Sequence, residues 1–318
     1  MPKFIFSNAI GSFVFSESCK IADELVFKDI EQYANKKIYE EKLREKHRDV
    51  AAPDENSLHQ ILLAFKDKKY FSDFLNKNLE LTRKSLKESV KKDLLIVQAV
   101  SCIKDIDKSI NLLVKRLREW YSYYNPEASY MVEDHEKFVS SIIKKTKAQL
   151  LKELNVNEKE SFGADMQEKD VSSIMLLAAQ LNSLYTLRKN YDDYLEDLEK
   201  ELCPNFMKVA GIAIAAKLIA HTGSLERLVK MPASTIQILG AEKALFRHMR
   251  NKKRNLPPKH GIIREHQLVQ KSEKNMQAKA ARALADKLSI AVKVDYFKGK
   301  FMGDELKKGL EDKFKVQF

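Results

Sequence analysis

The chain has 318 residues and a net charge of +12, and its 32% charged and 9% aromatic residues exclude an intrinsically disordered protein. Its three cysteines, Cys19, Cys102 and Cys203, are odd in number and widely spaced. That pattern argues against a disulfide framework or a zinc site and favours a reducing compartment, which we take to be the cytoplasm. The longest apolar run, residues 209–216, is far shorter than the roughly 20 residues of a membrane span. The first residues do not resemble a secretory leader.

The first part of the sequence predicts a small α/β unit. Residues 3–16, "KFIFSNAIGSFVFS", alternate aromatic with other side chains on both sides of a break. This pattern predicts two short strands of a hairpin, with Gly11 near the bend. Helical patterns follow over residues 29–50 and 57–86, and Pro53 separates them.

The middle of the sequence predicts long helices. Residues 95–117 carry one apolar stripe at helical spacing. Two amphipathic helices are then predicted at about 130–154 and 166–202, and the short turn between them makes them antiparallel. Between Ile174 and Leu202, nine positions step by three and four residues, and only Arg188 among them is polar. This is a heptad pattern typical of a coiled coil, although an ordinary helical-bundle hairpin has the same periodicity.

The last part of the sequence predicts further helices. Residues 207–222 read as a buried helix that Gly223 closes, and Ser224 is placed to cap the helix after it. The Ala, Arg and Leu spacing over residues 272–297 is strongly helical. Residues 298–318 predict a short charged helix and a tail.

The positive charge is concentrated in one segment. Residues 241–300 contain 16 Lys or Arg and 5 Asp or Glu, so they hold a net charge of +11 out of +12. A basic patch on a nearly neutral body is the pattern expected of a protein that binds a polyanion. The alternative is a solvated surface loop without a partner.

Within this segment, the spacing of the cations points to an RNA contact. Lys243, Arg247 and Arg250 lie four and three residues apart, so they share one helix face. Pro257-Pro258 stiffens the loop that follows, which lowers the cost of ordering it on binding. Lys and Arg bind phosphate, and a histidine ring can stack on a base. The candidate contacts are Lys243, Arg247, Arg250, Lys252, Lys253, Arg254, Lys259 and His260, with Lys279 and Arg282 on a later helix as further candidates.

No catalytic motif is present in the sequence. It lacks a Gly-rich phosphate loop, a Gly-x-Ser-x-Gly elbow, a His-Glu-x-x-His pair and paired cysteines. The seven histidines are scattered, and His260 and His266 have no further ligand at metal-binding spacing. We therefore expect a protein that is not an enzyme and binds no metal or cofactor itself.

Three motifs in this segment resemble a known family. They are Gly-Ala-Glu-Lys at 240–243, Ala-Leu-Phe-Arg at 244–247 and Pro-Pro-Lys-His-Gly at 257–261. Together they resemble the Nop domain, the RNA- and protein-binding module of box C/D ribonucleoproteins and of a spliceosomal relative. Residues 4–16, 97–127 and 221–234 are similar to the same family, so the resemblance covers almost the whole chain. The compact archaeal form is the nearest match, although Tyr-Asn-Pro-Glu at 124–127 replaces the common His-Phe-Pro-Glu.

The resemblance implies a fold and a division of labour. The fold would be mainly α, with a small N-terminal α/β domain, a long antiparallel coiled-coil hairpin and an all-α C-terminal Nop domain. Residues 1–125 would bind fibrillarin, the methyltransferase that carries S-adenosylmethionine. Residues 126–205 would pair two copies, and residues 206–318 would bind guide RNA together with a small ribosomal-protein-like kink-turn binder. The implied function is a scaffold for guided RNA 2′-O-methylation. The alternative is a non-catalytic RNA-binding assembly factor of a splicing or ribosome type, without a methyltransferase partner.

The resemblance also adds site residues. Glu242 and Gly261 fall where the family contacts RNA and the small partner, beside the cations already named. The predicted dimer contacts lie on the heptad stripe. They are Leu177, Leu181, Leu184, Tyr191, Leu195 and Leu198.

Overall fold

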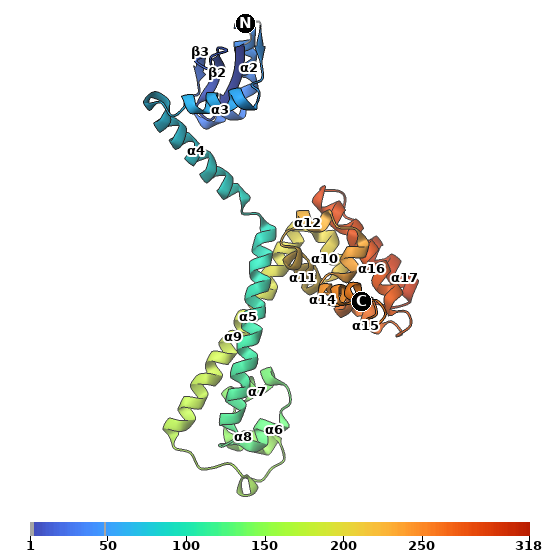
Figure 1. Ribbon diagram of the computed structural model, residues 1–318. Coiled ribbons are helices and arrows are strands. Elements are labelled where there is room, and N and C mark those ends of the chain that lie inside the picture. The colour runs from blue at the N-terminus through green and yellow to red at the C-terminus, as the bar shows by residue number, and fades with distance from the viewer. Residues whose placement is uncertain (1–2, 48) are drawn as a thin grey trace. The chain divides into compact units, whose positions relative to one another are not determined.

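The computed structural model describes residues 3–47 and 49–318 (Figure 1), and Arg48, inside the first predicted helix, lies outside them. The chain divides by packing into two compact units, Met1–Lys91 and Lys92–Phe318. The domain boundaries predicted at residues 125 and 205 divide the chain by expected function and not by packing, and they stay predictions. Within the described ranges, the fold is mainly helical with one small sheet, and the predicted fold class is confirmed. None of the helices in these ranges has the length and apolarity needed to cross a membrane.

The first unit is built on a four-stranded sheet in the order β3-β2-β1-β4. Strands β1 and β2 form the predicted antiparallel hairpin, in which Phe4 lies opposite Phe15 and Asn8 opposite Gly11. The Asn8 carboxamide oxygen accepts the backbone N–H of Ile10 at 3.0 Å and thereby closes the turn. Strands β3 and β4 were not predicted from the sequence. The strands are β1 (Lys3–Asn8), β2 (Gly11–Phe15), β3 (Ile21–Val26) and β4 (Val50–Ala51).

Helices cover both faces of this sheet, which explains why every residue of β2 is buried. Phe13 and Phe15 point to one face and form an aromatic core with Phe65, whose ring centroid lies 4.9 Å from that of Phe13. Val14 points to the other face and packs against Leu43. Side chains of a strand alternate between faces, so one short strand serves two cores. The helices are α1 (Ile30–Ala34), α2 (Lys36–Lys46), α3 (Glu55–Ala64) and α4 (Lys68–Ser89).

The second unit begins with a long helical hairpin made of α5 (Lys92–Tyr121) and α9 (Glu168–Leu202), which run side by side in Figure 1. Their direction follows from two buried clusters. Ile96 of α5 packs in one cluster with Leu198 of α9, and Val114 packs in the other with Ile174. The hairpin is therefore antiparallel, but the partner of α9 is α5 and not the predicted helix at 130–154.

The predicted helix at 130–154 is wrong, because that segment forms shorter helices with their own caps. They are α6 (Pro126–Met131), α7 (His135–Lys144) and α8 (Lys147–Glu153), followed by the 3-10 helix η1 (Glu158–Glu160). The side chains of Asp134 and Thr146 accept the backbone N–H groups of Lys137 and Gln149, so α7 and α8 each begin at a new N-cap.

Arg118 of α5 fixes the backbone of the turn that separates α6 from α7. Its guanidinium donates to the backbone carbonyls of Ser129 at 2.6 Å and Val132 at 2.7 Å, and to Nδ1 of His135 at 2.9 Å. It also lies 4.4 Å from the ring centroid of Phe138. These contacts fix the backbone between α6 and α7 in a non-helical path, so a long-range contact overrides the local helical pattern.

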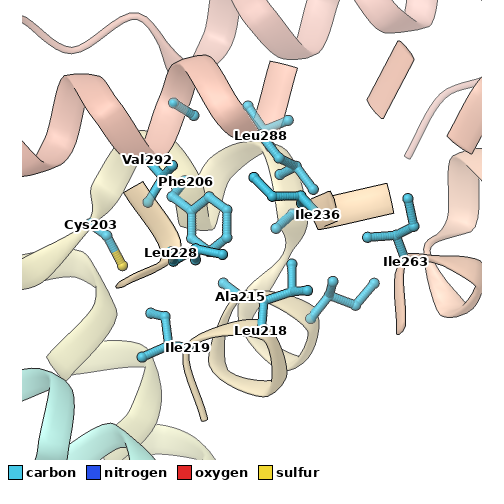
Figure 2. Close-up of a cluster of buried hydrophobic side chains, with 14 of the residues drawn as sticks. Cys203, Phe206, Ala215, Leu218, Ile219, Leu228, Ile236, Ile263, Leu288 and Val292 are labelled. Carbon is cyan, nitrogen blue, oxygen red and sulfur yellow. The ribbon is translucent and has the colours of Figure 1, made fainter. Parts of the chain in front are cut away.

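The remaining helices form an all-α domain around α16. Figure 2 shows its core, in which Phe206, Leu228 and Leu288 lie among other fully buried apolar side chains. Gly211, with φ +75°, splits the predicted helix at 207–222 into two. The helices are α10 (Pro204–Ala210), α11 (Ile212–Thr222), α12 (Leu225–Val229), α13 (Ala233–Ile238), α14 (Glu242–Arg250), η2 (Ile262–Glu265), α15 (Gln267–Lys271), α16 (Gln277–Tyr296) and α17 (Gly303–Phe314).

Two sequence signals for helix ends are confirmed. Gly223 ends α11 with φ +81°, in the left-handed region that favours glycine. The Ser224 hydroxyl accepts the backbone N–H of Arg227 at 3.2 Å and caps α12. The Asp93 carboxylate accepts the N–H of Leu225 at 3.1 Å, which ties the start of α5 to the start of α12.

Candidate nucleic-acid interface

Residues 240–260, which we call the basic arm, leave the helical domain and return to it at the same place. The N–H of Gly261 donates to the carbonyl of Gln237 at 2.9 Å, and the N–H of Ile262 donates to the carbonyl of Leu239 at 2.7 Å. The Gln237 side chain donates to the carbonyl of Lys259 at 2.6 Å. These three bonds close the base of the arm.

Glycine is required at the base because the two backbone segments lie so close. A Cβ atom on Gly261 would lie 1.8 Å from the Leu239 carbonyl oxygen. Gly240 has φ +85°, and a Cβ atom there would also lie 2.6 Å from the Ile262 side chain. The glycines of two of the three family-like motifs therefore have a backbone role, since they let the arm begin and end in contact with itself.

A short polar cluster fixes the first turn of α14 to the end of α11. The Glu242 carboxylate accepts the Gly240 N–H at 2.8 Å and lies 2.6 Å from Nε2 of His221. Partial burial alone would raise the pKa of Glu242, but the bonds from Gly240 and His221 outweigh it and hold that pKa below its ordinary value. A carboxylate in the first turn is also favourable to the helix dipole. Glu242 thus positions α14 and is only half exposed.

The far end of α14 is closed by Asn251 and Asn255, which were not predicted as functional residues. Asn255 donates its side-chain N–H to the carbonyl of Arg247 at 3.2 Å, and its own carbonyl lies 2.7 Å from Nδ1 of His248. Asn251 accepts the N–H of Arg254 at 3.1 Å. Residues 251–255 therefore fold back onto α14 and keep their cations beside those of the helix.

The predicted cations line this arm and face solvent. Helix α14 has no buried residue. Within residues 3–47 and 49–318, none of the arm's seven Lys and Arg side chains pairs with a carboxylate, and all seven are exposed. They are Lys243, Arg247, Arg250, Lys252, Lys253, Arg254 and Lys259. His260 and Gly261 are half-buried at the base of the arm. The structure therefore brings these residues together, as the spacing predicts.

The arm also carries exposed apolar side chains. Phe246 is 65% exposed, Met249 is 60% exposed and Leu256 is 87% exposed. Large apolar side chains gathered on a small element are typical of a protein–protein contact. The arm thus offers cations for phosphate and apolar surface for a protein.

Lys279 and Arg282 lie outside the arm, on the exposed face of α16. Helix α16 packs against α13, the helix that leads into the arm. These two cations are three residues apart and add positive charge to the same domain.

The predicted dimer contacts lie mostly inside the hairpin. Leu181, Leu195 and Leu198 are at most 8% exposed and pack against α5 and the helical domain of the same chain. Leu177, Leu184 and Tyr191 are half-buried against the same clusters. The heptad stripe is therefore the seam of the intramolecular hairpin. The large exposed apolar side chains of α9 are Leu176, Leu187 and Tyr194, at 66%, 41% and 42% exposure.

The described ranges contain no group of three or more His, Cys, Asp or Glu side chains placed to hold a metal ion. Cys19 and Cys203 are buried, and Cys102 is half-buried. Burial raises the pKa of the Cys203 thiol well above its ordinary value, so it is kept in the thiol form.

Comparison with known proteins identifies the family of the chain. Residues 102–316 match the family model Nop, described as "snoRNA binding domain, fibrillarin". A NOP5 family protein of Methanocaldococcus jannaschii is 46% identical over 242 residues, which are 71% of this chain and 58% of that protein. Nucleolar protein 58 of Schizosaccharomyces pombe is 35% identical over 252 residues, 74% of this chain and 49% of that protein. The matched part is thus about half to three-fifths of these relatives' length.

Among solved structures, a chain of a fibrillarin/Nop5p complex matches with a TM-score of 0.46 and 23% identity over 98% of each chain. The family model covers about two thirds of the sequence, and it includes the whole basic arm. The chain therefore belongs to the Nop family.

Proposed function

We propose that the chain is a non-catalytic scaffold of a box C/D guide ribonucleoprotein that directs RNA 2′-O-methylation. The observation that supports it is the basic arm, which carries three exposed apolar side chains and seven cations that pair with no carboxylate in the described parts of the chain. Such a mixed surface suits a composite target, namely the phosphates of a folded RNA next to a protein already bound to it. The target would be a kink-turn in the guide RNA together with the small protein that binds the kink-turn.

Residues 1–125 would bind fibrillarin, the protein that the description of the matching family model also names. S-adenosylmethionine would be bound by that partner. A scaffold that holds a catalyst and a guide at a fixed separation contributes through positioning, because it converts an encounter between molecules into a step within one assembly.

The hairpin would pair two copies of the chain. Because the heptad stripe is used within the chain, we place the contact on the exposed side chains of α9, Leu176, Leu187 and Tyr194. Replacing Leu176 and Leu187 with Glu should then shift the chain from dimer to monomer in analytical ultracentrifugation. A dimer that persists in this variant would place the contact elsewhere.

Reconstitution tests the proposal as a whole. Guide RNA, fibrillarin and the kink-turn-binding protein would be mixed with and without this chain, and methylation of the guided nucleotide would be measured. We expect methylation only when the chain is present. Full methylation in its absence would refute the scaffold role.

A further inference from the structure

A second exposed cluster lies at the turn between α16 and α17, away from the basic arm in sequence. Residues 296–301 read Tyr-Phe-Lys-Gly-Lys-Phe, and we call them the aromatic turn. Phe297 is 74% exposed, Phe301 is 54% exposed and Tyr296 is 39% exposed. The Tyr296 and Phe297 rings meet edge to face, with centroids 5.2 Å apart. Three aromatic rings thus face solvent within six residues.

The backbone of the aromatic turn is held at both ends by one buried residue. Asn205 donates its side-chain N–H to the Asp295 carboxylate at 2.7 Å, and its carboxamide oxygen accepts the N–H of Met302 at 2.6 Å. The N–H of Gly299 donates to the carbonyl of Val294 at 2.7 Å and closes the end of α16. Because these bonds already order the turn, little conformational entropy remains to be lost when a partner binds.

The charge of the turn is positive and accessible. Lys293, Lys298 and Lys300 are exposed, and none of them pairs with a carboxylate in the described parts of the chain. The neighbouring acids are engaged elsewhere, since Asp295 bonds to Asn205 and Asp304 pairs with Lys208 at 3.0 Å. Lys298 has φ +55°, in the left-handed region where glycine is usual.

We propose that the aromatic turn is a binding site for single-stranded RNA, separate from the basic arm. Exposed rings that alternate with lysines are the combination used for single strands, because bases stack on the rings while the cations contact the phosphates. Double-stranded RNA would not fit, since its bases are already stacked. The proposal rests on the proposed function only in taking RNA as the polymer. In a guide ribonucleoprotein, such a site would hold unpaired guide or target RNA near the domain that carries the arm.

The test uses the full-length chain and a fluorescein-labelled 12-mer of uridine. Fluorescence anisotropy would give its Kd for the unchanged chain, for the double variant Phe297→Ala and Phe301→Ala, and for Phe162→Ala as a control. Phe162 is 93% exposed, but the only lysine within four residues of it in sequence, Lys159, lies between Glu158 and Glu160. We expect the double variant to bind at least tenfold more weakly, since stacking contributes about 1–3 kcal/mol per base. The control should bind within twofold of the unchanged chain.

A gain of signal tests the contact directly. In a chain that carries Trp120→Phe and Phe297→Trp, the new indole should retain binding, and oligouridine should quench its fluorescence. An unchanged Kd in the double alanine variant, or an indole that oligouridine does not quench, would overturn the proposal. Preferential binding of the turn to phosphatidylserine vesicles would also overturn it.

Assembly on a kink-turn RNA with the small partner, measured in the same variants, separates this inference from the proposed function. The double alanine variant should assemble as the unchanged chain does, because the basic arm is intact. Loss of assembly in Arg247→Ala and Arg250→Ala with oligouridine binding retained would support two sites. Equal loss of both activities in either set of variants would overturn the claim that the sites are separate.

Discussion

The burial of the Glu199 carboxyl group predicts a measurable pH dependence of the free energy of unfolding. The Glu199 side chain is fully buried, and neither carboxylate oxygen has a hydrogen-bond partner among the described residues. It lies on α9 next to Leu198 and close in sequence to Cys203, both of which belong to the core of the helical domain. Burial raises the pKa of Glu199 to about 9, so at pH 7 the folded chain holds a neutral carboxyl group there.

The sign and size of the effect follow from proton linkage. In the unfolded chain the carboxyl group ionises at its ordinary pKa of 4.5, whereas in the folded chain it ionises near 9. Between these values the folded state binds one proton more, so the free energy of unfolding falls as pH rises, by about 1.4 kcal/mol per pH unit. Below pH 4.5 this group has no effect. At pH 7 its burial lowers the free energy of unfolding by about 3 kcal/mol.

Glu199→Gln removes the titration while keeping the shape of the side chain. We expect this variant to be more stable than the unchanged chain by about 3 kcal/mol at pH 7, and equal to it near pH 4.5. Urea unfolding at pH 5, 6, 7 and 8 would measure the difference. Trp120, the single tryptophan, lies in the same compact unit as Glu199 and reports its unfolding by fluorescence.

Glu196→Gln is the matched control one turn earlier on α9. Glu196 is partly exposed and pairs with Lys200 at 2.7 Å, so its loss should change stability by less than about 1 kcal/mol at every pH. Parallel stability curves for the unchanged chain and Glu199→Gln across this pH range would refute the reasoning. Such a result would mean that Glu199 reaches water in the folded state.

Three further predictions concern the arm and the hairpin. The double variant Arg247→Ala and Arg250→Ala should weaken RNA binding and reduce the slope of log K against log salt by about 2, while its unfolding midpoint stays unchanged. A slope that stays the same would mean that these cations do not contact phosphate. Gly261→Ala should weaken RNA binding more than the double variant does, because the added Cβ atom clashes with the backbone at the base of the arm. Normal RNA binding by this variant would show that binding does not need the closed base of the arm. Arg118→Ala should lower the free energy of unfolding by about 3 kcal/mol in urea titrations, because the substitution leaves several backbone carbonyls without a hydrogen-bond donor. A loss below about 1 kcal/mol would mean that water replaces the guanidinium.

Local signals in the sequence predicted the elements that depend on local interactions. The β1–β2 hairpin followed from alternation around Gly11, and the start of α12 followed from Gly223 and Ser224. The heptad stripe on α9 also marked a buried face. Its partner could not be predicted, because several segments have helical periodicity and the pairing of α5 with α9 depends on contacts between residues far apart in sequence.

The interruption of the predicted helix at 130–154 also depends on a contact between residues far apart in sequence, and here a single residue makes it. Arg118 contacts carbonyls 11 and 14 residues later, and nothing in the local pattern indicates this long-range contact. Strand β4 has only two residues and exists because it pairs with β1 across more than forty residues. Such elements are defined by their partners and not by their own propensity.

For the candidate interface, the charge pattern was sufficient to find the cations but not the way they are held. The base of the arm is closed by backbone bonds between Gln237 and Gly261 and between Leu239 and Ile262, which have no side-chain signature. The sequence signal that could have located the base of the arm was the position of its glycines. In a chain with only nine glycines, two of them, Gly240 and Gly261, flank the cations of the basic arm.

The way the basic arm is attached explains why its cations are free to bind. Helix α14 buries no residue, so the arm contributes little to the core and is fixed at its base by backbone bonds and by the contact of Glu242 with His221. Seven like charges on one element repel each other, and in a core element they would need carboxylate partners. Here the base bonds hold the element in place, and the repulsion remains until an anion relieves it. Neutralising the arm should therefore leave folding unchanged and act on binding alone, which separates the two roles of this domain.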